Sequence, residues 1–263
     1  MRLNSRAARS IVVGLAILLL GACASSPKAP KPVIRTVGVI SAIGDQFHQR
    51  QIGRAAKDSD ETTSPLQPWE IDAFVVEQAS ALLGKRYKVS KVTHRPGAFA
   101  PDKIHFPDEK SPRGDNRRPV EEVVRTEAKP QGLDAYVVIT RGFAPFADTK
   151  QVVRGLGVAK GNGVAENRAY LHALYWMTVV DGRSFNIIGD LKAPPLKEPP
   201  RPPGSAVEPV AVIDGPNLPT DPRFATDNLT RLTLDRQRRL KTELHTLIGE
   251  SLPMSLAAVK LLD

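Results

Sequence analysis

The stretch LDAYVVIT, residues 133–140, gives the strongest strand signal in this chain. It is an almost uninterrupted apolar run rich in β-branched residues, which is typical of a strand that is buried on both faces. A short helix is expected immediately before it, over residues 120–128. A helix that leads into a buried strand is characteristic of α/β units, so this run is predicted to be the central strand of a sheet.

Upstream of this run, the sequence alternates between predicted strands and a predicted helix. The helix begins at Pro68 and continues to Leu83, where Gly84 ends it. Polar composition predicts loops over residues 54–67 and 95–119. Residues 33–43 are rich in β-branched residues and residues 87–93 alternate, so both predict strands, and a weak strand is expected over residues 47–52 after the turn at Gly44-Asp45.

Downstream, the pattern changes to a meander followed by a long helix. Strands are predicted over residues 151–156, 169–180 and 184–188, and residues 155–163 form a glycine-rich connection. Asp181-Gly182 predicts a two-residue hairpin of type I′, in which both residues would need positive φ. The longest helix is predicted from Thr226 to about Ser251, and Pro253 is expected to kink or restart it.

These segments predict an α/β (α+β) fold with a single mixed β-sheet. Helices would pack mainly on one face of the sheet, and the chain would end in a β-meander and a long C-terminal helix. We expect a single globular domain over residues 33–263, with proline-rich loops near 95–119 and 193–222.

The N-terminus has the organisation of a secretory signal peptide. Arg2, Arg6 and Arg9 precede the short apolar core Ile11–Leu20, which is well below the roughly 20 residues needed to span a bilayer. The sequence LGAC that ends at Cys23 resembles the lipobox of bacterial lipoproteins. This resemblance implies cleavage of residues 1–22 and acylation of Cys23.

Cys23 is the only cysteine of the chain, so acylation would leave no thiol for a disulfide, a metal or nucleophilic catalysis. Residues 23–32 are rich in proline, serine and lysine and predict a disordered tether. Ala24 stands where an aspartate would favour retention in the inner membrane of enterobacterial systems. The lipoprotein resemblance therefore implies an outer-membrane anchor that faces the periplasm, if the source is Gram-negative.

The charge of the chain suits an envelope protein. It has 37 basic and 28 acidic residues, and only three of the basic ones precede Cys23, so the processed chain would carry about +6. A modest positive excess is compatible with anionic lipid headgroups or cell-wall polymer. No nucleic-acid recognition motif is present, and we expect no nucleic-acid partner.

Three segments resemble the periplasmic domains of the curli-secretion lipoprotein, the lipoprotein activators of penicillin-binding proteins, and the amino-terminal domain of TolB. These are the early VGVI strand, the LDAYVV strand and the hairpin that begins Val179-Val180-Asp181-Gly182-Arg183. The resemblance covers roughly residues 33–190 and 226–262. It implies a protein that binds or assembles with other envelope proteins.

Motifs for chemistry are few. The glycine-rich residues 155–163 lack the ending of a phosphate-binding loop, and residues 44–48 lack the partner motifs of a metallophosphoesterase. The remaining histidines, His94, His105, His172 and His245, do not have metal-ligand spacing, and His172 is expected to be a hydrogen-bonded core residue. We therefore expect no catalytic residue, metal or cofactor.

The leading hypothesis is a non-enzymatic, lipid-anchored envelope protein that binds an envelope protein or a cell-wall partner, in an oligomeric state that the sequence leaves open. The first alternative is an envelope hydrolase whose site is assembled from distant residues, and the second is a subunit of a pore or ring. Arg236 lies at helical spacing between Leu232 and Leu240, so it is placed inside an apolar stripe. It either extends along the edge of the core or contacts an anionic partner.

Overall fold

The computed structural model describes residues 33–53, 59–105, 116–128, 131–146, 151–161, 169–192, 210–213, 229 and 232–263. The chain divides into two units, residues 1–33 and 34–263, and the elements described below belong to the second. The predicted signal peptide, Cys23 and tether lie outside the described residues, as does most of the proline-rich segment 193–222.

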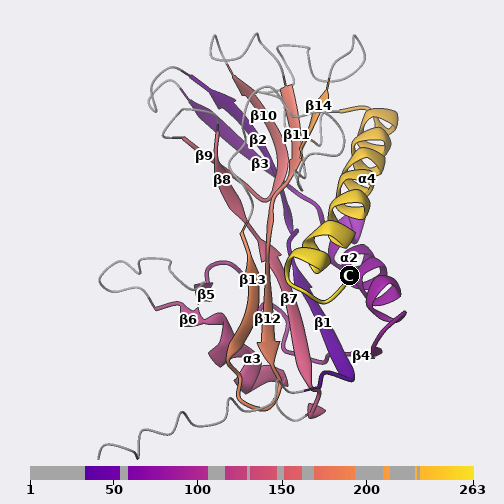
Figure 1. Ribbon diagram of the computed structural model, residues 1–263. Helices are drawn as coiled ribbons and strands as arrows, with labels where there is room; N and C mark the ends of the chain where they lie inside the picture. Colours follow the sequence, from indigo (N-terminus) through magenta and orange to yellow (C-terminus); the bar gives the residue numbers. More distant parts are fainter. Residues whose placement is uncertain are drawn as a thin grey trace, which may run out of the picture. The chain divides into compact units, whose positions relative to one another are not determined.

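The first sheet has the predicted central strand. Strand β7 (Ala135–Arg141) pairs in parallel with β1 (Thr36–Ala42) and antiparallel with β12 (Tyr175–Asp181). Strands β4 (Lys88–Lys91) and β13 (Ile187–Leu191) form its edges, and the strand order is β13-β12-β7-β1-β4 (Figure 1). Residues 135–140 of β7 are all buried, as their apolar composition requires.

A second five-stranded sheet is present where we expected a single sheet, so that part of the prediction is wrong. Its strand order is β14-β11-β10-β2-β3, and it mixes parallel and antiparallel pairs. The expected loop 54–67 contains β3, the glycine-rich connection contains β10, and β14 lies in a segment expected to be irregular. The strands are β2 (Gln46–Ile52), β3 (Asp60–Pro65), β10 (Leu156–Gly161), β11 (Ala169–Ala173) and β14 (Val210–Ile213).

The long strand predicted over 169–180 is divided between the two sheets. Leu174 separates β11 from β12, and three backbone hydrogen bonds join Leu174 and two glycines to one another. Gly142 N donates to Leu174 O at 3.0 Å, Leu174 N to Gly155 O at 2.9 Å, and Gly155 N to Gly142 O at 2.9 Å. We call these three residues the strand crossing. A Cβ on Gly142 would lie 2.8 Å from the Tyr175 carbonyl carbon, so the crossing requires glycine there.

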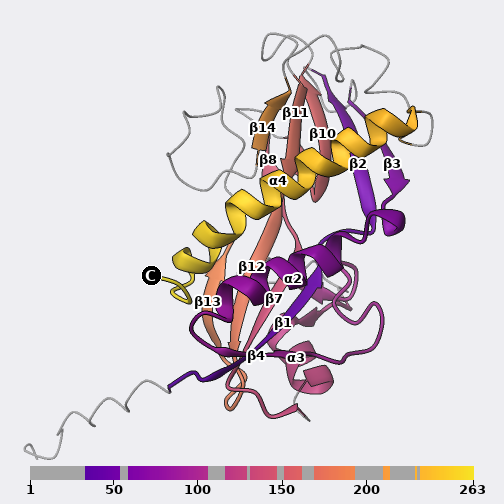
Figure 2. The same ribbon diagram turned by 90° about the vertical axis from the view of Figure 1, so that its right-hand side faces the viewer.

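The helices cover both faces of the first sheet. Helices α2 (Ile71–Leu83) and α4 (Leu234–Ala258) lie on one face, and their buried residues share one core with strands of both sheets (Figure 2). Helix α3 (Val120–Ala128) packs against the opposite face. The α/β class and the long C-terminal helix are confirmed. None of the described helices is both long and apolar enough to cross a membrane.

Helix α4 begins later than predicted, which changes the position of Arg236. Its N-cap is Thr233, whose side chain accepts a hydrogen bond from the Arg236 backbone N–H, and it continues through Pro253 to Ala258. Leu232 is buried but precedes the helix. Arg236 therefore lies exposed in the first turn, and its predicted place inside the apolar stripe is wrong, because the stripe begins at Leu240.

The β12–β13 hairpin is confirmed, but its turn is longer than predicted. Phe185 N donates to Asp181 O and Asp181 N to Asn186 O, both at 2.9 Å, so four residues form the loop. Phe185 has a φ of 58°, whereas Gly182 is not among the residues with positive φ. The predicted type I′ turn is therefore wrong. A Cβ on Gly182 would lie 1.8 Å from Leu133 O, which explains why glycine occupies this position.

Candidate functional site

A cavity of about 410 Å³ lies beside the strand crossing. This volume falls in the usual range of small-molecule sites. Its lining comes from five separate stretches of the sequence: residues 101–104, Arg117, residues 141–143, residues 152–154 and Trp176. The cavity therefore exists only because the fold brings these segments together.

One wall is the outer face of a small hairpin formed by β8 (Phe143–Pro145) and β9 (Val152–Arg154). Ala144 and Val153 point inward to a small core with Phe146 and Tyr170. Because side chains alternate along a strand, Phe143, Val152 and Arg154 face outward into the cavity. Phe143 and Arg154 are direct cross-strand partners, so their side chains lie next to each other.

The rest of the lining combines guanidinium groups with an aromatic surface. Arg141 ends β7 and is half-buried, while Trp176 from β12 is only 5% exposed. The Trp176 and Phe143 rings lie 4.6 Å apart between centroids, tilted by 53°. Arg117 adds a third guanidinium group, next to β6 (Arg118–Pro119), and Asp102 is the only carboxylate that lines the cavity among the described residues.

Arg141 and Arg154 have no ion-pair partner among the described residues, although Arg154 is close enough to Glu61 to help lower the pKa of that carboxyl. Asp102 pairs instead with Lys103 at 3.5 Å. A guanidinium group stays charged at every physiological pH, and its planar set of donors matches carboxylate and phosphate oxygens. The cavity can therefore hold an anion.

A neighbouring hollow of about 350 Å³ differs from the cavity in the pairing of its charges. Its basic side chains have carboxylate partners: Arg95 pairs with Glu127, and Arg118 lies 3.9 Å from Glu122. The Arg95 guanidinium lowers the pKa of Glu127, mainly through hydrogen bonding. Because carboxylates of the chain already lie next to these arginines, binding an external anion would bring less electrostatic stabilisation here than in the cavity.

Behind the cavity, a histidine and a carboxylate support Arg141. His48 Nδ1 lies 2.8 Å from Glu61 Oε1, and Glu61 Oε2 lies 3.1 Å from Arg50. A carboxylate only accepts, so Nδ1 carries the proton, and the lone pair of Nε2 can accept from Arg141 Nη1 at 3.4 Å. The hydrogen bond from His48 lowers the pKa of Glu61, against an opposing effect of burial. This chain of contacts orients the Arg141 side chain.

His172 is fully buried in the second sheet, which confirms the prediction of a core histidine. Its Nδ1 donates to Gly155 O at 2.9 Å, at the strand crossing. Burial lowers its pKa to about 4, so it is neutral at pH 7. Gly157 pairs with both His48 and His172, and a Cβ there would lie 2.0 Å from His48 O. His172 supports the backbone of the crossing and does not line the cavity.

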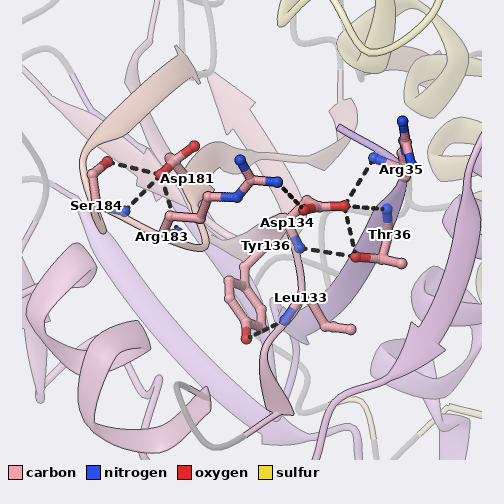
Figure 3. Close-up of polar contacts among 8 residues, drawn as sticks. All are labelled: Arg35, Thr36, Leu133, Asp134, Tyr136, Asp181, Arg183 and Ser184. Carbon is pink, nitrogen blue, oxygen red and sulfur yellow. Dashed lines mark hydrogen bonds and ion pairs between the residues drawn. The ribbon is translucent and has the colours of Figure 1, made fainter. Parts of the chain in front are cut away.

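A second polar cluster lies at the other end of the first sheet (Figure 3). Asp134 Oδ2 accepts from the Thr36 backbone N–H at 2.9 Å and from Arg35 N–H at 3.0 Å, while its Oδ1 accepts from Arg183 at 2.9 Å. These bonds, led by that from Thr36, lower the pKa of Asp134 to about 2. Among the described residues, the donors to Asp134 come from the start of β1 and from the β12–β13 turn, so the cluster holds strand ends together.

The residues singled out from the sequence lie elsewhere. Arg236 is exposed on α4 and does not line the cavity. His94 packs edge-on against Phe99, and His245 stacks on Phe74 at 4.0 Å. No group of three His, Cys, Asp or Glu side chains that could hold a metal ion occurs within the described ranges.

Sequence reasoning missed the cavity residues, although one signal for them exists. Arg141-Gly142 directly follows the buried run of β7, and ligands of open α/β sheets bind outside the carboxyl ends of the strands. The contributions of the β8–β9 hairpin and of residues 101–117 depend on tertiary structure and have no local signal.

Comparison with known proteins gives no family. No family model matches this chain, and no curated protein matches it. Among solved structures, the hypothetical protein CT253 from Chlamydia trachomatis is similar at 12% sequence identity, with a TM-score of 0.30. The match covers 84% of this chain and 98% of that chain.

Proposed function

We propose that this protein is a lipid-anchored cell-envelope protein that acts as a non-enzymatic binding or assembly module for another envelope component. Acylation at Cys23 anchors it in the outer membrane, facing the periplasm. The observation that carries the binding role is the cavity at the strand crossing, where Arg141 and Arg154 lie without a carboxylate partner among the described residues. Anionic lipids and cell-wall polymers provide groups of the complementary charge.

The sequence supports this proposal in two further ways. The LGAC sequence ending at Cys23 resembles a lipobox and follows a signal-peptide core. The VGVI and LDAYVV strands resemble those of envelope lipoproteins that act as assembly subunits or protein-binding modules, and both are adjacent strands of the first sheet.

The alternative, an envelope hydrolase, would place a nucleophile or a metal next to a general base. Glu61 and His48 have the carboxylate–imidazole arrangement of such a base. The group that faces His48 Nε2, however, is the guanidinium of Arg141, a donor with no nucleophilic character. This arrangement favours binding over hydrolysis.

Crosslinking in the native envelope tests the proposal. A tagged full-length protein should give a discrete crosslinked product, and Arg141→Glu should remove it because the reversed charge repels an anion. Arg35→Glu is the matched control, since Arg35 is an exposed arginine that directly precedes β1, whereas Arg141 is the last residue of the parallel strand β7. Cys23→Ser should move the protein from the membrane to the soluble periplasmic fraction. Crosslinking that is equal in wild type and Arg141→Glu, or acyl labelling that persists in Cys23→Ser, would contradict the proposal.

A further inference from the structure

We propose that the cavity binds an oxyanion, carboxylate or phosphate, that is attached to a flat apolar or aromatic group. Arg141 and Arg154 hold the oxyanion, and Phe143 with Trp176 holds the flat group. This inference rests on the proposed function in that it gives the ligand chemistry of the same cavity.

The first argument is electrostatic. Arg141 is half-buried, and a buried cation without a counter-charge is costly, because it loses hydration without gaining an ion pair. His48 Nε2 contacts Arg141 Nη1 at 3.4 Å but supplies no carboxylate. An oxyanion between Arg141 and Arg154 supplies the missing charge through charge-assisted hydrogen bonds. The neighbouring hollow, where Arg95 is paired with Glu127, shows how this chain neutralises an arginine internally when no ligand is required.

The second argument concerns shape. Arg154 and Phe143 are cross-strand partners on the outer face of the hairpin, so a guanidinium and an aromatic ring lie side by side. Phe143 is 38% exposed although its ring packs against Trp176, which leaves aromatic surface open toward the cavity. A ligand that presents an anion to Arg154 therefore presents its adjoining atoms to Phe143. Aromatic side chains favour flat or apolar groups at such a position.

Calorimetric titration of the full-length protein, purified in a non-ionic detergent, tests this inference with phenyl phosphate as the probe. We expect saturable binding that is weakened at least tenfold in Arg141→Gln and in Arg154→Gln. Arg154 is exposed, so its replacement leaves the fold intact even if Arg141→Gln does not fold. Phe143→Ala should weaken phenyl phosphate more than inorganic phosphate, whereas Arg35→Gln should bind both as the wild type does.

Competition identifies the source of the anion. Displacement of phenyl phosphate by glycerol phosphate supports a lipid headgroup, and displacement by benzoate alone supports a carboxylate ligand. Displacement by benzyl alcohol as strongly as by benzoate would overturn the inference, and so would the absence of binding or equal affinity in wild type and Arg154→Gln. Binding of phenyl phosphate without an Arg141-dependent crosslink in the envelope would contradict the proposed function only.

Discussion

Asp134 and Thr36, which are 98 residues apart in sequence, form reciprocal hydrogen bonds at the beginning of strands β7 and β1. Asp134 Oδ2 accepts from the Thr36 backbone N–H at 2.9 Å and from Thr36 Oγ1 at 3.0 Å, while Asp134 N donates to Thr36 Oγ1 at 2.9 Å. Arg183 adds an ion pair from the β12–β13 turn (Figure 3). One carboxylate therefore joins the beginnings of β1 and β7 to the β12–β13 turn.

Asp134→Asn should destabilise the fold by about 1–2 kcal/mol at pH 7, because it removes charge-assisted hydrogen bonds. The pKa of Asp134 is lowered from 3.8 to about 2, so the ionised form is favoured in the folded state. The stability that ionised Asp134 contributes is fully present above pH 4 and is lost as the pH falls toward 2. After allowance for solvent screening, the difference in unfolding free energy between wild type and variant should narrow by about 1 kcal/mol over that range. Denaturant titrations at pH 7, 4 and 2 measure it, and a constant difference would contradict the assignment.

Gly182→Ala and Gly182→Asn should destabilise the fold by similar amounts, about 2–3 kcal/mol, because either Cβ collides with Leu133 O. If positive φ were the reason for glycine at this position, Asn would be tolerated much better than Ala. Melting temperatures of the two variants distinguish these explanations. A near-native melting temperature for Gly182→Asn would mean that the steric account is incorrect.

Gly249→Ala, in the interior of α4, should stabilise the protein by up to about 1 kcal/mol. Nothing lies within 4 Å of a Cβ built at Gly249, so the substitution gains helix propensity without a collision. Chemical denaturation measures the change in the free energy of unfolding. Gly249→Ala is also the control for the Gly182 variants, because it adds a Cβ where nothing lies within 4 Å. A loss of stability would show that the helix does not have open space there.

The stability contributed by neutral His172 should disappear under acidic conditions. Burial lowers its pKa from 6.5 to about 4, so the unfolded chain binds more protons than the folded one between these pH values. Stability is therefore complete above pH 6.5 and falls as the pH decreases toward 4, by about 2–3 kcal/mol.

His172→Asn is the variant that isolates this effect, because its side-chain N–H can replace the Nδ1 donor to Gly155 O. The variant should be less stable than the wild type at pH 7.5, and the difference should narrow at pH 4.5. Unfolding titrations at both pH values provide the measurement. Parallel losses in the two proteins would rule out His172 as the titrating group.

The first sheet was predictable because its segments carry strong local patterns. The apolar run of β7, the helical spacing of α2 and the hairpin after Val180 each indicate their structure within a short window. The second sheet was predictable only in part: β2 and β11 lie within predicted strands, whereas β3 was missed because it is mostly polar and β10 because it contains glycines. The pairing of β2 with β10 joins residues about 100 positions apart, and no local pattern encodes it.

The boundary of α4 was missed for a related reason. Leu229 and Leu232 continue the leucine spacing of the helix and are buried, yet they precede the N-cap Thr233. The spacing of leucines in the sequence indicates which side chains are buried, but it does not show whether the backbone there is helical. This error placed Arg236 in the apolar stripe. The position of Arg141 and Arg154 in the cavity depends on the strand crossing, which joins residues distant in sequence.

The most direct test of the anion-binding cavity is a crystal structure of the protein soaked with phenyl phosphate. We expect the phosphate within hydrogen-bonding distance of Arg141 and Arg154, with the phenyl ring against Phe143 and Trp176. A cavity that stays without phenyl phosphate at a saturating concentration, or a phosphate bound only at other residues, would contradict the account.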